Sequence, residues 1–326
     1  MQPQRVEDGL RRALNAATAD APPQLAQALW HAVFSGGGRV RPRLVLGVAK
    51  ALGDPRPELT DAAAVAVELM HCASLVHDDL PCFDNAQTRR GVPSVHKLFG
   101  EELAVLAGDA LIVAAFAELP RIGTAEPSAC ARLGRLLASA SGASRGLIAG
   151  QAWESESEVD LERYHRAKAA SLFEAAVTMG AVAARGSVDQ WRPVGTALGL
   201  AYQVADDLAD AFGNPASMGK ATGKDEATGR PNAVAEWGAT PARERVDELI
   251  GEAVAAIPVC GGRDTLVAEI EHIGARLWPD EPVSGSAAAA GDAEPMPSPA
   301  GSSREIEPAA DEAQGSLAPV PRLAGS

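Results

Sequence analysis

Two clusters of aspartates, each directly after an apolar stretch, carry the clearest chemistry in this sequence. The first cluster is Asp78, Asp79 and Asp84, and the second is Asp206, Asp207 and Asp210. Because the apolar residues before each cluster recur with helical spacing, both clusters should lie at the ends of helices. Carboxylate oxygens are ligands that suit Mg²⁺, which takes phosphate oxygens and water as its other ligands. The sequence therefore predicts a site that holds Mg²⁺ against a diphosphate.

The spacing within each cluster supports this interpretation without requiring it. Asp206 and Asp210 share a helix face, where their charges repel each other unless a cation lies between them. Pro81 separates Asp78 from Asp84, so the helix should break there and the chain should bend back. Either cluster alone fits an ordinary solvated helix end as well as it fits a metal site.

Basic residues accompany both clusters. They are Arg39, Arg41, Arg89, Arg90, Lys168, Lys220 and Lys224. Taken alone, Arg89-Arg90 fits a surface pair and Asp84-Asn85 fits a helix cap. Cations beside two acidic clusters, however, are what a diphosphate needs for its remaining oxygens. His71, two helical turns before Asp78, is a further candidate donor to that group.

The composition predicts a helical protein and excludes some functions. The chain has 326 residues, of which 46% are hydrophobic and only 4% aromatic, so its core must consist mainly of Ala, Leu and Val. Ala and Leu favour helices. The net charge of −14 argues against a nucleic-acid surface, and the chain lacks the glycine-lysine pattern of a P-loop.

The cysteines and the N-terminus predict a cytoplasmic protein. The four cysteines form no C-x-x-C pair and no metal-ligand spacing, which is typical of reduced thiols. The first residues lack the apolar segment of a secretion signal. No uninterrupted apolar run reaches membrane-spanning length.

Helical periodicity extends over most of the chain and predicts one all-α domain over residues 1–278, with about ten helices. The expected helices cover residues 6–17, 24–34, 43–52, 60 to the first cluster with Thr60 as N-cap, 101–119, 128–148, 161–185, 194–211, one that starts at Thr240-Pro241, and one that ends near Leu277. Residues 279–326 are rich in Pro, Ala, Gly, Ser and acids and should be disordered. The run Gly36-Gly37-Gly38 should let the backbone approach a ligand closely.

Several motifs in order match one family. They are GGGRVRP, HDDLPCFDNAQTRRG, the pair Gly150-Gln151, YHRAK, YQVADDLAD and MGKATGKD, within residues 25–277. The sequence closely resembles the trans-isoprenyl diphosphate (polyprenyl) synthases, and among these the bacterial geranylgeranyl diphosphate synthases of the carotenoid pathway. The resemblance implies an all-α isoprenoid synthase bundle with a deep central cavity, usually dimeric. It also implies Mg²⁺-dependent condensation of isopentenyl diphosphate with an allylic diphosphate, farnesyl diphosphate or shorter.

The resemblance also implies a role for each matching residue. All six motif aspartates would hold three Mg²⁺ on the allylic diphosphate, and Arg89, Lys168 and Lys220 would bind the same group. Arg41, His71 and Arg90 would bind isopentenyl diphosphate, and Gln203 would face the reacting centre. Lys168, Gln203 and Lys220 are therefore the expected catalytic residues.

Product length depends on the helix before Asp78, because the growing tail should run along it. Members of the family that stop at fifteen carbons typically carry an aromatic residue near the fifth position before the first aspartate. Here the residues are Ala73 and Ser74, which predicts a twenty-carbon product. Met70, Phe116 or Leu119 could supply the eventual stop.

Four positions depart from the family pattern. Gly38 replaces a lysine that usually binds isopentenyl diphosphate, Ala169 lacks a hydroxyl, and Ala86 and Gln87 replace further acids. The alternatives are a farnesyl diphosphate synthase, a terpene cyclase and a non-catalytic regulatory partner of a synthase. A cyclase would have no use for a second diphosphate site, and a regulatory partner usually loses motif aspartates that this chain keeps.

Overall fold

The structure is a computed structural model that describes residues 2–122, 126–212 and 230–277. Most of these residues are helical. The helical elements are α1 (Gln2–Thr18), α2 (Pro23–Phe34), α3 (Val40–Ala51), α4 (Pro57–Asp78), α5 (Val95–Phe99), α6 (Glu101–Glu118), η1 (Pro120–Ile122), α7 (Pro127–Ser141), α8 (Leu147–Trp153), α9 (Leu161–His165), η2 (Arg166–Ala170), α10 (Ser171–Ala183), α11 (Val188–Phe212), α14 (Ala233–Trp237), α15 (Ala239–Ala255) and α16 (Arg263–Leu277). A short antiparallel pair, β1 (Thr88–Arg89) and β2 (Val92–Pro93), lies between α4 and α5. The predicted all-α fold is confirmed.

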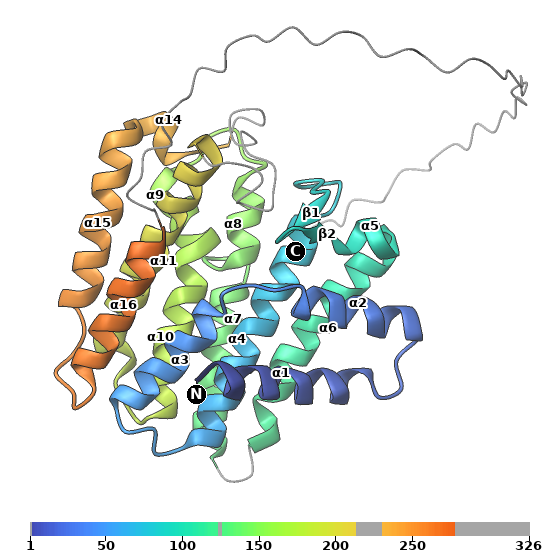
Figure 1. Ribbon diagram of the computed structural model, residues 1–326, viewed down its shortest axis with the longest axis horizontal. Coiled ribbons are helices and arrows are strands. Elements are labelled where there is room, and N and C mark those ends of the chain that lie inside the picture. Colours follow the sequence, from blue (N-terminus) through green and yellow to red (C-terminus); the bar gives the residue numbers. More distant parts are fainter. Residues whose placement is uncertain (1, 123–125, 213–229, 278–326) are drawn as a thin grey trace, which may run out of the picture. The chain divides into compact units, whose positions relative to one another are not determined.

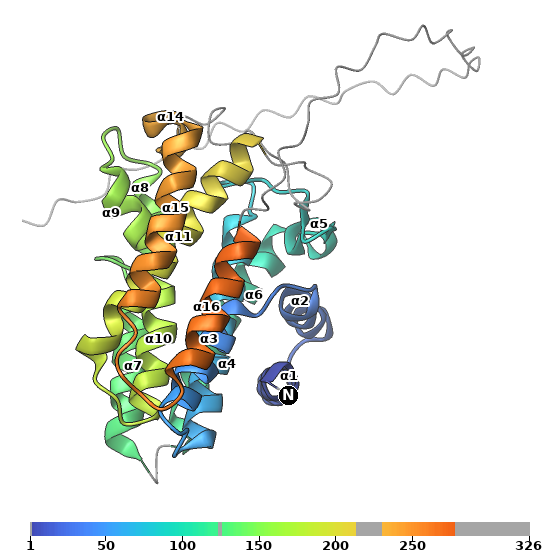
Figure 2. The same cartoon turned by 60° about the vertical axis from the view of Figure 1, so that its left-hand side comes forward.

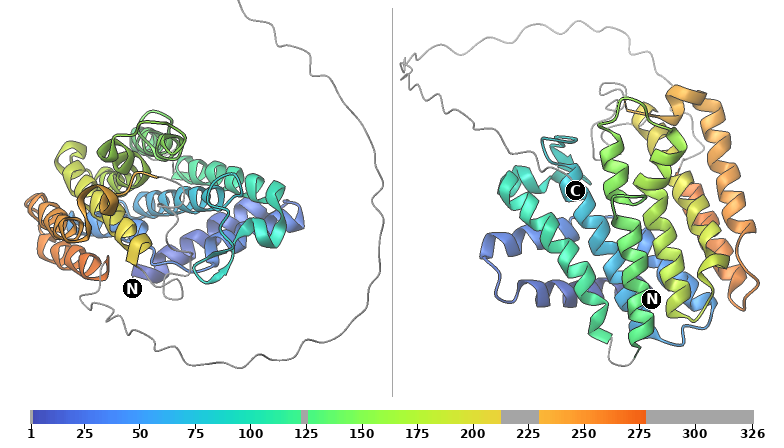
Figure 3. Two further views of the ribbon diagram at one scale, coloured as in Figure 1. Left: turned by 90° about the horizontal axis from the view of Figure 1, so that it is seen from above. Right: turned by 180° about the vertical axis from the view of Figure 1, so that it is seen from behind.

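The long helices form a bundle around α4. Helix α4 packs against α3, α6 and α10, and α11 packs between α10 and α15. Helices α15 and α16 lie outermost on one side, as seen from above in Figure 3. Helices α1 and α2 run across the long helices, and the turned view of Figure 2 shows both nearly end-on.

Helix α4 is buried because most of its side chains are small and apolar. It begins at Pro57, where a proline needs no hydrogen-bond donor. The predicted start at Thr60 was wrong: Thr60 lies inside the helix, and its hydroxyl donates to Asp54 Oδ1 at 2.6 Å. Among the described residues, α4 alone is long and apolar enough to cross a membrane, but 78% of that segment is buried inside the fold.

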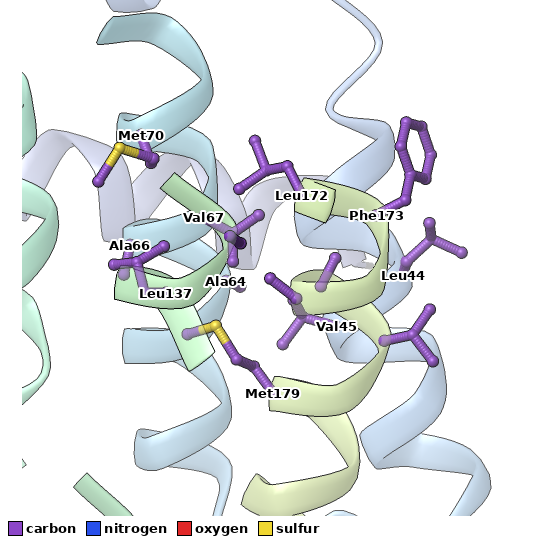
Figure 4. Packing of buried hydrophobic residues seen from close by; sticks show 14 of the residues in the cluster. Leu44, Val45, Ala64, Ala66, Val67, Met70, Leu137, Leu172, Phe173 and Met179 are labelled. Carbon is purple, nitrogen blue, oxygen red and sulfur yellow. The ribbon is translucent and has the colours of Figure 1, made fainter. Parts of the chain in front are cut away.

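The core fills the space between α3, α4, α7 and α10. In Figure 4 the side chains of Val45, Val67, Leu137 and Met179 point toward one another from these helices. Each is fully or almost fully buried. A buried side chain of this size contributes about 1.5–3 kcal/mol, so packing fixes the position of α4 independently of the acidic residues at its end.

Several other predicted helices have different bounds in the structure. The predicted helix 128–148 divides into α7 and α8 between Gly142 and Gly146. Glycine permits this tight turn, because a Cβ on Gly146 would lie 2.4 Å from the Ala140 carbonyl oxygen. The predicted helix 161–185 contains the π-helical turn η2. Helix α11 begins at Val188 and includes Pro193, so it starts earlier than predicted.

The described residues belong to one compact unit, Met1–Asp280. The predicted disordered tail, 279–326, lies outside the described residues, as does the MGKATGKD motif with Lys220.

Candidate active site

A cavity of about 1170 Å³ opens beside the C-terminal ends of α4 and α11. Asp78 and Asp84 line it from the first cluster, and Asp206 and Asp210 line it from the second. Its other walls include apolar side chains from α4, α6, α7 and α8, among them Met70, Ala73, Phe116, Ala138 and Leu147. Two acidic clusters far apart in the sequence therefore share one cavity with a largely apolar interior.

The first cluster forms because the chain turns back after α4. The N–H of Asp84 donates to the carbonyl oxygen of Asp78 at 2.9 Å, and Asn85 adopts a positive φ of 44° in the turn. This is the bend that Pro81 predicted. Asp78 Oδ1 is buried and has no hydrogen-bond partner among the described residues. Burial raises the pKa of Asp78, Lys168 lowers it, and the charge of Asp84 raises it further.

The second aspartate of the first pair has a different environment. Asp79 is 2% exposed and does not line the cavity. The Arg89 Nε–H lies 3.0 Å from Asp79 Oδ1 and 3.2 Å from Oδ2. Burial raises the pKa of Asp79, and its ion pair with Arg89 opposes that shift. Asp79 therefore fastens the end of α4 to β1.

Asp207 in the second cluster is equally enclosed. It is 1% exposed, and its Oδ1 accepts from Gln203 Nε2 at 2.9 Å. Its Oδ2 accepts from the N–H of Ala233 at 2.7 Å and lies 3.1 Å from His165 Nε2. Asp207 thus ties α11 to α9 and α14. Of the six aspartates predicted to hold metal, Asp78, Asp84, Asp206 and Asp210 line the cavity, whereas Asp79 and Asp207 do not. Metal binding by all six stays a prediction.

Lys168 lies on η2 and also lines the cavity. Its ammonium donates to Glu154 and lies 5.4 Å from the centre of the Tyr164 ring. Burial disfavours the charged form of Lys168, but Asp78, Tyr164 and Glu154 outweigh it and raise the pKa of Lys168 well above its ordinary value. The side chain is therefore a cation in the site.

A glycine allows η2 to hold Lys168 in this place. A Cβ on Gly150 of α8 would lie 2.5 Å from both the backbone N and the Cα of Lys168. Only glycine lets the two backbones approach so closely. This gives a physical role to the Gly150-Gln151 motif, whose Gln151 also lines the cavity.

Arg41 and His71 form a partly buried basic group on the same cavity wall. Arg41 Nη1 lies 3.2 Å from His71 Nε2, and the guanidinium lies 4.5 Å from the centre of the Phe173 ring. Burial, together with the charge of Arg41, lowers the pKa of His71 well below its ordinary value. Arg41 Nε is buried and has no hydrogen-bond partner among the described residues. This pair therefore has donor capacity that a ligand can use.

The glycine run holds an arginine. Gly37 has a φ of 113°, and a Cβ there would lie 2.4 Å from Arg90 Cζ. Arg90 also donates to the carbonyl oxygen of Gly36. Gly37 and Gly38 line the cavity, and the space beside Gly37 is taken by Arg90. Close approach of a ligand to this glycine backbone stays a prediction. Arg39 is buried in ion pairs with Glu7 and Glu68 and does not serve as a free cation.

The remaining predicted residues are also placed by the structure. Gln203, Ala73 and Ser74 line the cavity, and the Ser74 hydroxyl donates to the carbonyl oxygen of His71 at 2.8 Å. Arg89 lines the cavity while paired with Asp79.

Three site residues were missed in the sequence: Glu154, Tyr164 and Arg230. Glu154 Oε1 accepts from the Tyr164 hydroxyl at 2.8 Å, and Glu154 Oε2 lies 2.9 Å from Arg230 Nη2. Arg230 Nη1 lies 2.7 Å from Asp84 Oδ1. The sequence did contain a signal for Tyr164, because this residue lies one helical turn before Lys168. It contained no such signal for Arg230, which lies between a glycine-rich segment and Pro231.

Comparison with known proteins identifies the family. The family model for polyprenyl synthetase matches residues 22–257. The chain is 50% identical to the geranylgeranyl diphosphate synthase of Rhodobacter capsulatus over 268 residues, which are 82% of this chain and 93% of that protein. It is 48% identical to the geranylgeranyl diphosphate synthase of Cereibacter sphaeroides over 277 residues, which are 85% and 96% of the two chains.

A solved structure extends this likeness to the fold. Geranyltransferase from Helicobacter pylori, crystallised with magnesium and isoprenyl diphosphate, matches with a TM-score of 0.70 at 27% identity, over 82% of this chain and 95% of that chain. The chain belongs to the polyprenyl synthetase family, as its motifs predicted.

Proposed function

We propose that this protein is a Mg²⁺-dependent geranylgeranyl diphosphate synthase. It joins isopentenyl diphosphate to an allylic diphosphate, farnesyl diphosphate or shorter, and releases diphosphate. One observation carries the proposal: both acidic clusters and several cations line a single cavity whose deeper walls are apolar. An amphiphile with a diphosphate head and a hydrocarbon tail matches this division of polarity.

The residues present fit magnesium. The cavity-facing ligands Asp78, Asp84, Asp206 and Asp210 offer hard oxygens, and Asp78 Oδ1 is buried without a hydrogen-bond partner among the described residues. Within residues 2–122, 126–212 and 230–277, no three acidic, His or Cys side chains lie close enough to hold an ion by themselves. Mg²⁺ bound here would therefore need phosphate oxygens and water to complete its coordination. We expect three ions, as the family resemblance implies.

The cations divide between the two substrates. Lys168 lies beside Asp78 and Glu154 and would bind the allylic diphosphate, together with Arg89 and with Lys220, which lies outside the described residues. Arg41, His71 and Arg90 would bind isopentenyl diphosphate. Gln203, which lines the cavity while its Nε2 donates to Asp207, would face the reacting carbon.

The chemistry follows from this arrangement. Bound Mg²⁺ supplies positive charge that stabilises the departing diphosphate. The allylic C–O bond breaks and its electron pair leaves with the diphosphate, and Lys168 and the other cations hold that group. The double bond of isopentenyl diphosphate attacks the allylic carbon, and a proton passes to the departing diphosphate. Apolar walls exclude the water that would otherwise capture the cation.

The cavity favours a twenty-carbon product. At about 1170 Å³ it exceeds the range of about 300–1,000 Å³ that is usual for small-molecule pockets. Ala73 and Ser74 place no bulky side chain on the wall near Asp78. The hydrocarbon can therefore extend toward Met70 and Phe116.

We further propose a cytoplasmic homodimer that binds no nucleic acid. Helix α6 exposes Val105, Leu106 and Val113, which are 42%, 51% and 68% exposed, around the exposed Asp109. Large exposed apolar side chains grouped on one helix are typical of a subunit interface. The same face on a second copy is the partner we propose.

Product analysis tests the function. The purified protein is incubated with Mg²⁺, labelled isopentenyl diphosphate and either farnesyl or geranyl diphosphate, and the products are separated by chain length. A linear twenty-carbon diphosphate is expected. A fifteen-carbon product formed from geranyl diphosphate and not extended would indicate a farnesyl diphosphate synthase. A hydrocarbon would indicate a cyclase, and no diphosphate release would indicate a regulatory partner.

A further inference from the structure

Arg230 bridges two carboxylates at the polar end of the cavity. One of its terminal nitrogens lies 2.7 Å from Asp84 Oδ1, and the other lies 2.9 Å from Glu154 Oε2. The Arg230 side chain is 11% exposed, and those of Asp84 and Glu154 are 15% and 7% exposed. Arg230 thus holds a defined position within the site.

The bridge places a fixed positive charge on one of the four cavity-facing aspartates. A guanidinium that contacts two carboxylates is held by charge-assisted hydrogen bonds from both. Burial opposes the charged form of Arg230, but Asp84 and Glu154 outweigh it and raise the pKa of Arg230 above its ordinary value. Arg230 therefore remains a cation at any working pH.

Glu154 keeps the guanidinium close to the site even if Asp84 is released. Besides Arg230 it accepts from the Tyr164 hydroxyl at 2.8 Å and from Lys168. Asp84, by contrast, is the carboxylate that the proposed function assigns to Mg²⁺. A guanidinium on Asp84 Oδ1 and a metal ion on the same carboxylate repel each other, so the bridge opposes metal binding at Asp84.

We propose that Arg230 is a built-in counter-ion for the first acidic cluster, which holds Asp84 against Glu154 in the empty enzyme and opposes the binding of a metal ion at Asp84. The inference rests on the proposed function, because it takes Asp84 as a metal ligand. Breaking the contact between Arg230 and Asp84 costs free energy that metal binding must supply. The wild-type protein should therefore bind metal alone more weakly than a variant that lacks Arg230.

The test measures metal binding without substrate. The full-length protein is titrated with Mn²⁺, and free Mn²⁺ is followed by electron paramagnetic resonance. In Arg230→Gln the apparent dissociation constant for Mn²⁺ should fall about tenfold, the effect of losing one well-formed interaction of this kind. Arg245→Gln is the matched control, because Arg245 pairs with Glu248 and Glu252 on the exposed face of α15. It should leave Mn²⁺ binding unchanged.

A second variant distinguishes the effect of the two-carboxylate bridge from the effect of the positive charge alone. Arg230→Lys keeps the positive charge but cannot span both carboxylates with one planar group, so its Mn²⁺ affinity should lie close to that of Arg230→Gln. Wild-type affinity in Arg230→Lys with higher affinity in Arg230→Gln would show a charge effect only and overturn the proposal. Unchanged or weaker binding in both variants, or no Mn²⁺ binding by any of the proteins, would overturn it as well.

Product formation by the wild-type protein is measured in parallel. If the wild-type protein makes geranylgeranyl diphosphate while Mn²⁺ binding does not respond to residue 230, the counter-ion inference fails and the proposed function stands. If it makes no prenyl diphosphate, the proposed function itself fails. Thermal unfolding of each variant confirms that the titrated protein is folded.

Discussion

Adjacent aspartates in this site have different surroundings. Asp78 and Asp206 line the cavity, whereas Asp79 and Asp207 are each about 98–99% buried and bonded to neighbouring elements. Successive residues on a helix point about 100° apart, which separates the two environments. We therefore expect one aspartate of each pair to bind the ligand and the other to hold the helix end in place.

Substitutions in the second pair separate these tasks. Asp207→Asn should lower the free energy of unfolding by about 1–3 kcal/mol, because buried donors on α9 and α14 lose a charged acceptor. Asp206→Asn should weaken metal binding in the presence of substrate by about tenfold or more, the cost of losing one charged ligand oxygen, with little change in stability. Chemical denaturation and metal titration measure the two effects. Equal losses of stability in both variants would contradict the different roles expected for Asp206 and Asp207.

His71 makes stability depend on pH. Burial and Arg41 lower the pKa of His71 well below 6.5 in the folded protein. Between that lowered value and 6.5 the unfolded chain binds a proton that the folded protein does not, so stability falls as the pH drops below about 6.5.

The variant His71→Asn should therefore lose part of the acid-side slope, at most about 1.4 kcal/mol per pH unit for one proton. Denaturant unfolding at pH 7.5, 6.5, 5.5 and 5.0 measures the slope. His272→Asn, an exposed position on α16, is the control and should keep the wild-type slope. An unaltered slope in His71→Asn would mean that His71 is protonated in the folded protein.

At the scale of elements, the close approach of α8 to η2 decides where Lys168 lies. A methyl group on Gly150 would meet the backbone of Lys168 at 2.5 Å. Neither backbone can shift without moving its helix. A side chain at position 150 would therefore displace Lys168, the cation in the site.

We expect Gly150→Ala to reduce kcat about 100-fold, the scale of loss that a displacement of roughly 1 Å causes in a catalytic group. Steady-state kinetics and circular dichroism together would show a folded but slow enzyme. Gly251→Ala on α15 is the control: no atom lies within 4 Å of its added Cβ, so it should retain activity and gain about 0.5–1 kcal/mol. Similar kinetics for the two variants would remove the role assigned to Gly150.

Helix α4 forms the wall along which the hydrocarbon extends. Ala73 lines the cavity one to two turns before Asp78. In Ala73→Phe the added ring should block the tail, so that the main product shortens from twenty to fifteen carbons. Chromatography of the hydrolysed products measures the shift. Ser74→Ala, which adds no bulk, should keep the wild-type product, and a twenty-carbon product from Ala73→Phe would place the tail elsewhere.

At the scale of the whole molecule, the α6 face predicts self-association. Val113→Glu would place a charge in each copy of a symmetric interface, and like charges brought together cost several kcal/mol. We expect the dimer dissociation constant to rise by about a hundredfold or more. Light scattering after size-exclusion chromatography measures the mass. Val259→Glu, at a residue that is 99% exposed outside α6, should leave the dimer intact; a dimeric Val113→Glu would place the interface on another face.

The sequence predicted the helical fold and the family because those depend on local patterns. Alanine-rich helical periodicity, the two acid-ended helices and the bend at Pro81 are all visible within short segments. Which aspartate of each pair faces the cavity depends on the rotation of a packed helix, which the sequence does not state. The bridge from Arg230 to Asp84 and Glu154 joins three segments distant in the chain, and only their packing brings them together.

The guanidinium of Arg90 fills the space that a side chain at position 37 would need. Any larger residue at position 37 would therefore displace Arg90. A redesign of this enzyme for a different substrate should vary the two positions together, even though they belong to separate loops.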